Sequence, residues 1–250
     1  MKAKLYFLGI LTILSINSQS VCGAQEQAQP SRDNAHIAAG KCLKLIQISH
    51  TLGTQTVYVN SRALKVCGEN KHVLYAQAPD WQVRFANLET KRYYECPAEK
   101  YQSKQASYLK KYVGPMYSGY LLKNGKPANI LGLPVICYAL VRKPDSRDDF
   151  DFKIENGSYC ITSEPKLDKR IALILAKLYS IPVTQGLPVK LIRCGKKKEL
   201  LFELNTPKVS QVPCKASDFE MPEGLTRCKT IEEIYEDKNK LNSIQELFKD

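Results

Sequence analysis

The sequence has few of the side chains that usually carry catalysis or bind metals. Its 250 residues include only three histidines, His36, His50 and His72, and one tryptophan, Trp81. It contains no His-Glu-x-x-His or Cys-x-x-Cys motif, so we expect no metal site. The nucleophile elbow Gly-x-Ser-x-Gly, the P-loop and the dinucleotide fingerprint are also missing. These absences favour a protein that is not an enzyme and that has no cofactor.

Two polar segments are open to a functional or a structural interpretation. Asp148, Asp149 and Asp151 could gather around calcium, but they lack the Gly and Glu spacing of a calcium loop, and a solvated acidic turn also explains them. The tyrosines and lysines between residues 101 and 120 could stack on sugars or bases, whereas packing of half-buried tyrosines is the simpler alternative. No RNA-recognition motif accompanies them, so we expect no nucleic-acid partner.

The sequence also lacks a hydrophobic run that could span a membrane. Leu5–Ile16 is an apolar run of 12 residues, shorter than the about 20 that a spanning helix needs. Lys2 and Lys4 precede this run, and the small residues Gly23 and Ala24 follow it. This order is typical of a cleaved secretory signal peptide, which we expect at residues 1–24. We therefore expect a periplasmic or secreted protein without a transmembrane segment.

Cysteine, in contrast, is abundant. The chain has nine cysteines, and eight of them lie beyond the expected leader. An even number behind a secretion signal indicates structural disulfides. The eight disulfide candidates are Cys42, Cys67, Cys96, Cys137, Cys160, Cys194, Cys214 and Cys228. Cys22 has two alternatives: it leaves with the leader, or cleavage directly before it and lipidation would make a lipoprotein.

The charge is strongly basic. The formal net charge is +12, and removal of Lys2 and Lys4 with the leader lowers it to +10. A basic exported protein is attracted to anionic surfaces such as phospholipid or acidic polymer. A simply soluble surface is the alternative, because the charge is scattered and Lys196-Lys197-Lys198 is the only run of three.

Hydrophobic patterns and turn residues predict short strands between a few helices. Helices are expected at residues 35–50, at the start of 101–123 with Ser103 as a possible N-cap, after the N-cap Asp168, and at 230–250 behind a capping box of Thr230 and Glu233. Strands are expected at residues 56–59, 63–66, 72–77, 81–85, 92–96, 132–141, 150–162, 186–194, 200–204 and 209–213. Asn156-Gly157 predicts a hairpin turn that would divide 150–162 into a strand pair, unless this segment is one long bent strand.

Three local patterns recur in one known family. The first runs from Val57-Tyr58-Val59 through Leu64-Lys65-Val66 and Pro79–Val83 to Asn87–Tyr94. The second is Gly186-Leu187-Pro188-Val189 followed by Leu204-Asn205-Thr206, and the third is Phe219–Leu225. With the order helix, β-meander, helix, β-meander, these patterns resemble LolA/LolB-like envelope proteins, including small uncharacterised periplasmic relatives. The resemblance covers about residues 40–230.

The resemblance implies an α+β fold, a curved, incomplete antiparallel β-barrel with helices covering its concave face. In the lipid and lipoprotein carriers of the family, that face holds acyl chains. The expected domains are a signal peptide at 1–24, a disordered lead-in at 25–34, a LolA-like β-rich domain at 35–229 and an amphipathic helix at 230–250. No lipoprotein-binding arginine matches, so the ligand-binding residues stay unassigned.

Eight cysteines can be joined completely in 105 ways. Neighbouring strands suggest the disulfides Cys67–Cys96, Cys137–Cys160 and Cys194–Cys214, which leaves Cys42–Cys228 to tie the first expected helix to the C-terminal segment. The function that best fits the sequence is a non-enzymatic exported binding protein that carries or senses a lipid or other apolar ligand. The alternative is a structural or interaction module of the cell envelope that docks an anionic polymer or membrane surface.

Overall fold

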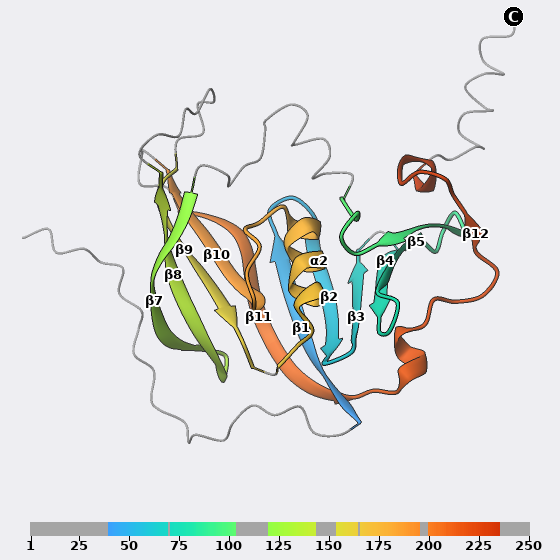
Figure 1. Ribbon diagram of the computed structural model, residues 1–250, viewed down its shortest axis with the longest axis horizontal. Coiled ribbons are helices and arrows are strands. Elements are labelled where there is room, and N and C mark those ends of the chain that lie inside the picture. The colour runs from blue at the N-terminus through green and yellow to red at the C-terminus, as the bar shows by residue number, and fades with distance from the viewer. Residues whose placement is uncertain are drawn as a thin grey trace, which may run out of the picture. The chain divides into compact units, whose positions relative to one another are not determined.

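The computed structural model describes residues 40–69, 71–103, 120–143, 154–164, 166–195 and 200–235. These residues form one 12-stranded sheet with one α-helix (Figure 1). The strands are β1 (Lys41–Ser49), β2 (Gly53–Asn60), β3 (Ala63–Gly68), β4 (His72–Gln77), β5 (Gln82–Asn87), β6 (Arg92–Pro97), β7 (Tyr120–Ile130), β8 (Leu133–Arg142), β9 (Ile154–Thr162), β10 (Leu187–Gly195), β11 (Leu200–Pro213) and β12 (Thr226–Arg227). The helix is α2 (Lys169–Tyr179), and two 3-10 turns follow, η1 (Ala216–Phe219) and η2 (Glu232–Ile234).

Two antiparallel meanders make up the sheet. Strands β1 to β6 lie side by side in chain order, and strands β7 to β11 do the same. The two meanders join where β1 pairs with β11, so that Leu45 lies between Val57 of β2 and Val209 of β11. The sheet is open, with β7 at one edge and the short β12, parallel to β6, at the other. The predicted antiparallel architecture is therefore confirmed as one open, curved sheet.

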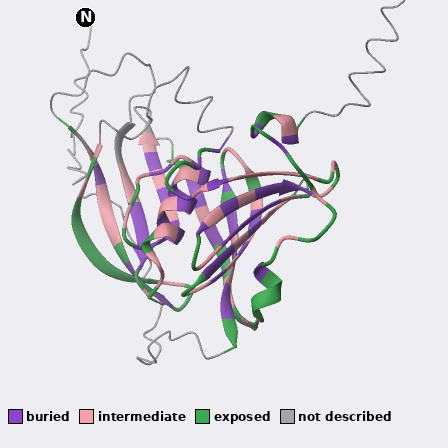
Figure 2. Cartoon of the chain, turned by 45° about the vertical axis from the view of Figure 1, so that its right-hand side comes forward, coloured by how far each residue is buried: buried purple, intermediate pink, exposed green. Residues whose placement is uncertain are grey.

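Apolar side chains gather on one face of the sheet, called the inner face below. In the first meander, Val57, Val66, Leu74 and Phe85 lie opposite one another across four strands, because alternate residues of a strand point to the same face. All four belong to the main hydrophobic core. Along the strands, buried residues alternate with partly buried and exposed ones (Figure 2).

Helix α2 packs its apolar stripe into the same core. Ile171, Ile174, Leu175 and Leu178 recur at helical spacing, and all four are buried there. Asp168 caps the helix as predicted, because its carboxylate accepts a hydrogen bond from the backbone N–H of Arg170 at 2.9 Å. The helix ends at Ser180, which adopts a left-handed conformation.

The helix expected over residues 35–50 is wrong in its described part, because Lys41–Ser49 is strand β1. Its inner face consists of Leu43 and Leu45 followed by Gln47 and Ser49, and all four are buried. Two polar residues at inner positions hide the apolar–polar alternation of a strand. Gln47 tolerates burial because its Nε2 donates hydrogen bonds to the Pro188 carbonyl at 2.8 Å and to Thr206 Oγ1 at 3.2 Å.

The hairpin turn expected at Asn156-Gly157 is also wrong. Both residues lie within the continuous strand β9, which pairs with β8 and β10. A Cβ at Gly157 would lie 2.5 Å from the Ile192 carbonyl oxygen, so glycine here serves a close approach of two strands rather than a turn. In the same way, the strands expected at 200–204 and 209–213 are two parts of the single strand β11.

Several other expectations lie outside the described residues. These are the signal peptide at 1–24, the lead-in at 25–34, the helix within 104–119, the acidic residues Asp148, Asp149 and Asp151, and residues 236–250 of the terminal helix. The described start of that last segment forms the 3-10 turn η2. The capping box predicted for Thr230 and Glu233 has a different partner, because the Glu233 carboxylate accepts its hydrogen bond from the backbone N–H of Lys229.

Within the described ranges, no helix has the length and apolar character to cross a membrane.

Candidate functional site

A cavity of about 470 Å³ opens on the inner face of the first meander. Its apolar lining comes from six parts of the chain: the β1–β2 turn, β3, β4, β5, α2 and the segment around η2. These apolar residues are Leu52, Val66, Leu74, Phe85, Leu178 and Ile231. Cavities of this size with a mostly apolar lining are typical of small-molecule sites. The cavity is therefore the candidate functional site.

Polar residues line the same cavity at the strand ends. Gln55 of β2 lies opposite Gly68 of β3, and His72 opens β4 after the turn that contains Glu69. Gln55 and His72 point to the inner face, because they alternate with Val57 and with Leu74. Gly68 also lines the cavity, and because it has no side chain it leaves space beside Gln55 and His72.

Three aromatic rings form one wall. The His72 ring stacks on Phe85, with 5.6 Å between centroids and an interplanar angle of 5°, and Tyr235 lies 5.0 Å from His72. Burial lowers the pKa of His72, against a smaller opposing effect of Glu89, so the imidazole is neutral at pH 7. Burial also raises the pKa of Tyr235 to about 12, with a smaller contribution from Glu232. The wall is therefore uncharged at neutral pH.

Three polar atoms of the lining have no hydrogen-bond partner among the described residues. They are Gln55 Oε1, His72 Nε2 and the Tyr101 hydroxyl. Tyr101 is fully buried and Gln55 is 4% exposed. Buried polar atoms are nearly always satisfied. Three of the six buried side-chain atoms that have no partner among the described residues belong to residues of this cavity.

The segment around η2 closes the cavity wall and is fixed to the sheet by side chains of β5, β6 and the turn between them. The Ile234 carbonyl accepts hydrogen bonds from Asn87 Nδ2 at 3.4 Å and Thr90 Oγ1 at 3.3 Å. The Glu233 carbonyl accepts one from the Arg92 guanidinium at 2.8 Å. The end of the described chain therefore contributes directly to the site.

Sequence reasoning assigned no ligand-binding residue, although one signal was present. Gln55 and His72 occupy inner positions in strands whose other inner residues, such as Val57 and Leu74, are apolar. A polar residue in an otherwise apolar alternation indicates either a buried hydrogen bond or a binding site. The contributions of Tyr101, Leu178 and Tyr235 carry no such signal, because only the tertiary fold brings them here.

Of the predicted disulfides, the structure contains Cys137–Cys160, which links directly opposed residues of β8 and β9. This pairing is confirmed. The other described cysteines, Cys42, Cys67, Cys96, Cys194, Cys214 and Cys228, are present as thiols.

The other three pairings are wrong, because the sheet keeps the partners apart. Cys67 and Cys96 are separated by β4 and β5, and they point to opposite faces: Cys67 packs near Val73, whereas Cys96 lies in the main core. Cys194 lies beside Leu200 and Cys214 follows Pro213, so they mark opposite ends of β11. Cys42 packs against Phe219 on the outer face, whereas Cys228 lies in the main core.

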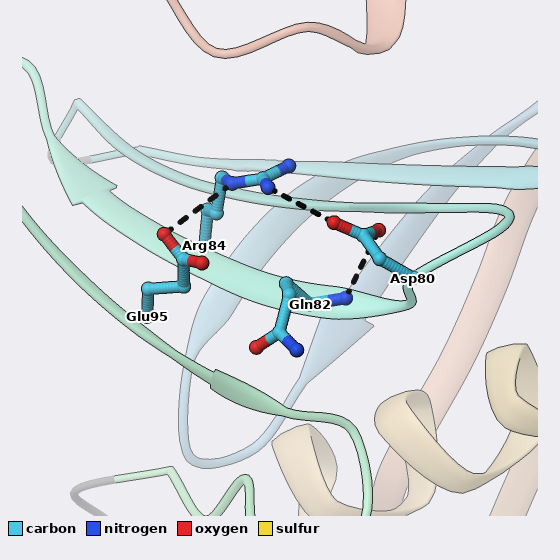
Figure 3. Close-up of polar contacts among 4 residues, drawn as sticks. All are labelled: Asp80, Gln82, Arg84 and Glu95. Atoms are coloured by element: carbon cyan, nitrogen blue, oxygen red, sulfur yellow. Dashed lines mark hydrogen bonds and ion pairs between the residues drawn. The ribbon is translucent and has the colours of Figure 1, made fainter.

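A row of basic and aromatic residues that ends in a glutamate crosses the outer face of the first meander, the face opposite the inner one. It consists of Lys44, Tyr58, Lys65, Tyr75, Arg84 and Glu95, each opposite the next on the neighbouring strand. Arg84 forms ion pairs with Asp80 at 3.2 Å and with Glu95 at 3.6 Å (Figure 3). Lys65 Nζ donates a hydrogen bond to the Asp218 carbonyl at 3.0 Å. Much of this positive charge is therefore already engaged within the protein.

In the part of the chain that the structure describes, no three His, Cys, Asp or Glu side chains are grouped in a way that could hold a metal ion.

Comparison with known proteins gave no matching family model and no matching curated protein. Solved structures with a similar course of the chain were found. An uncharacterised conserved protein from Thermus thermophilus is 8% identical, with a TM-score of 0.39, over 76% of this chain and 91% of that one. MucB in the Pseudomonas aeruginosa MucA/MucB complex is 11% identical, with a TM-score of 0.35, over 76% of this chain and 59% of that one.

A LolA superfamily protein from Nitrosomonas europaea is 6% identical, with a TM-score of 0.23, over 80% of this chain and 90% of that one. The LolA-like resemblance expected from the sequence thus recurs among the structural neighbours. Identities of 6–11% and TM-scores of 0.23–0.39 are too low for any ligand or partner of these proteins to be carried over.

Proposed function

We propose that this chain is an exported, non-enzymatic binding protein that carries or senses a small apolar ligand in the cavity between the inner face, α2 and η2. The observation that supports this most directly is the cavity itself, about 470 Å³ with a mostly apolar lining, beside the main hydrophobic core. The lining comes from the first meander, from α2 and from the chain's described end, so ligand occupancy could be sensed by all three.

The proposal includes the export route. Residues 1–24 act as a cleaved signal peptide, 25–34 as a disordered lead-in, 35–229 as the binding domain and 230–250 as a terminal amphipathic segment. The mature protein is then periplasmic or secreted. Sequencing the N-terminus of exported protein tests this, with cleavage after residue 24 as the expected result.

The alternative, a module that docks an anionic surface, has less support on the outer face of the first meander. Arg84 is neutralised by two carboxylates, and Lys65 is held by the Asp218 carbonyl. Lys44 and Lys65 also lie over tyrosine rings, each 5.5 Å from the ring centroid. No cluster of free cations is described there for an anionic polymer to bind.

Binding of Nile red, a neutral apolar dye, to delipidated protein tests the proposal. We expect saturable binding, because the dye moves from water into an apolar cavity. Leu52→Trp should fill part of the cavity and weaken binding by about tenfold or more. The matched control is Val183→Trp, at a residue that is 60% exposed and outside the lining. Equal binding by the two variants, or no binding by the unaltered protein, would contradict the proposal.

A further inference from the structure

The unpartnered atoms of the cavity differ in what they offer a ligand. Gln55 Nε2 already donates to the Leu52 carbonyl at 2.6 Å and to the Thr54 carbonyl at 3.0 Å, which leaves Oε1 as a free acceptor. The Tyr101 hydroxyl can both donate and accept, and so can a neutral imidazole through its two nitrogens. A group that both donates and accepts hydrogen bonds would satisfy Gln55 and Tyr101 together.

The charge of the lining opposes an anion. The lining contains one carboxylate, Glu69, and neither lysine nor arginine. Glu69 accepts a hydrogen bond from the backbone N–H of Thr54 at 3.3 Å, which keeps the carboxylate at this end of the cavity. The neighbouring His72 is neutral because burial lowers its pKa. A bound carboxylate or phosphate would lose its hydration and meet a like charge without a cationic partner.

We propose that the cavity takes an amphiphile whose polar end is an uncharged hydrogen-bond donor and acceptor, such as a hydroxyl or a primary amide, and that it excludes carboxylates and phosphates. This inference rests on the proposed function. The polar end contacts Gln55 and Tyr101, and the apolar part lies against Leu74, Phe85 and Leu178. The net positive charge of the chain attracts anions to its surface, whereas the cavity excludes anionic ligands.

A matched ligand pair tests the preference. Calorimetric titration of the full chain with n-octanol and with octanoate at neutral pH compares two polar ends on one alkyl chain. We expect n-octanol to bind about tenfold more tightly or better. This ratio corresponds to the free energy of one well-formed hydrogen bond together with the absence of repulsion between a ligand carboxylate and Glu69. Octanoate that binds as tightly as n-octanol would overturn the inference.

A matched pair of variants locates the polar contact. Tyr101→Phe removes a hydroxyl that has no hydrogen-bond partner among the described residues, so thermal stability should stay equal or rise while n-octanol affinity falls severalfold. The control is Tyr179→Phe, whose hydroxyl is also buried and unpartnered but does not line the cavity. The inference fails if Tyr101→Phe binds n-octanol normally. If Nile red binds but n-octanol does not, this inference alone fails; if neither binds, the proposed function fails too.

A second inference comes from an independent observation, the meeting of Cys42 and Cys214. Cys42 lies opposite Val212 in the β1–β11 ladder, and the backbone N–H of Cys214 donates to the Gly40 carbonyl at 2.9 Å. Cys42 and Cys214 pack with Phe219 in one apolar cluster on the outer face. Burial is the main reason that the pKa of the Cys42 thiol is raised to about 12, and the neighbouring Cys214 adds a smaller contribution.

The geometry points to a Cys42–Cys214 disulfide in the exported protein. In this reaction the two S–H bonds are lost and one S–S bond forms. Two protons leave, and two electrons pass to an oxidising disulfide, which is reduced to two thiols by exchange. Cys214 is more exposed than the buried Cys42, so the oxidant reaches Cys214 first, and the Cys42 sulfur then attacks Cys214 and displaces the oxidant's thiol. The bond joins the beginning of β1 to the end of β11, where the two meanders meet.

Refolding in oxidised glutathione, followed by proteolysis without reduction and mass spectrometry, tests this pairing. We expect one linked peptide pair that contains Cys42 and Cys214, besides the pair that contains Cys137 and Cys160. Cys42→Ser should abolish the first pair, leave the second, and lower the urea midpoint. If alkylation after denaturation labels both Cys42 and Cys214, or if either is linked to another cysteine, the inference is wrong.

Discussion

At the scale of single residues, Gly157 shows how closely the strands of the second meander approach. A Cβ at this position would lie 2.5 Å from the Ile192 carbonyl oxygen and 3.4 Å from the Leu140 side chain. Both neighbours belong to adjoining strands, so neither can move without disturbing the ladder. The sequence pattern Asn156-Gly157 does not distinguish this use of glycine from a turn, because both need a residue without a side chain.

We therefore expect Gly157→Ala to lower the free energy of unfolding by about 1–3 kcal/mol, the usual cost of overpacking. Urea unfolding followed by circular dichroism measures it. Gly68→Ala is the matched control: it is also a strand glycine, but its Cβ would meet its nearest neighbour, the His72 carbonyl oxygen, at an ordinary 3.5 Å. Equal losses in the two variants would contradict the steric explanation.

His72 gives the fold a dependence on pH. Burial holds the pKa of His72 below its ordinary value of 6.5, so the folded protein binds fewer protons than the unfolded chain. The free energy of unfolding therefore decreases as pH falls below about 6.5, toward the lowered folded-state pKa. The acidic residue acting on the imidazole, Glu89, opposes this shift only in part, and Tyr235 stays uncharged in this range.

We expect His72→Gln to reduce the loss of stability between about pH 7 and pH 5.5, measured by urea unfolding at each pH. His50→Gln serves as the control, because His50 is an exposed residue directly after β1. Should His72→Gln and the unaltered protein show the same pH dependence, the buried imidazole is not its source.

At the scale of secondary-structure elements, α2 depends on one local interaction and one tertiary contact. Asp168 caps its first turn and also pairs with the Arg170 guanidinium at 2.8 Å. The Arg170 hydrogen bond is the main reason that the pKa of the Asp168 carboxyl is lowered. The same guanidinium lies 4.8 Å from the centroid of the Trp81 ring. The cap thus orients a side chain of α2 on the first meander.

Replacement Asp168→Ala should lower the free energy of unfolding by about 1 kcal/mol, because the first turn loses its side-chain acceptor. Asp168→Asn should retain most of this contribution, since asparagine caps nearly as well. Thermal unfolding of both variants checks the prediction. An equal loss in the two would assign the effect to the charge rather than to the cap.

Elements with a local cause could be predicted from the sequence. The strands at 72–77 and 92–96 depend on the alternation of apolar and polar residues, and the Asp168 cap depends on a side-chain acceptor next to the helix in sequence. Strand β1 could not, because Gln47 occupies a core position where its Nε2 donates hydrogen bonds to residues of β10 and β11. Its burial depends on partners more than 140 residues away.

At the scale of the described domain, the pairing of β1 with β11 makes one core out of two meanders. Trp81 of the first meander and Leu191 of the second belong to the same hydrophobic core, which α2 shares. We therefore expect Leu191→Ala, which truncates a fully buried side chain at a cost of about 2–5 kcal/mol, to destabilise both meanders together.

The single tryptophan makes this measurable. In urea unfolding of Leu191→Ala, the midpoint from Trp81 fluorescence should shift as far as the midpoint from far-UV circular dichroism. The exposed Val183→Ala should shift neither. Two separate transitions, with Trp81 reporting an unchanged midpoint, would show that the meanders unfold independently.

The sequence by itself determined the antiparallel strands, the capped helix and a set of cysteines, because alternation, caps and residue counts are local properties. Tertiary structure alone decided which cysteines meet and where a cavity opens. Cys67 and Cys96 both lie in predicted strands, yet they point to opposite faces. Which side chains share a face depends on strand order and register, and these are set by the packing of the entire sheet.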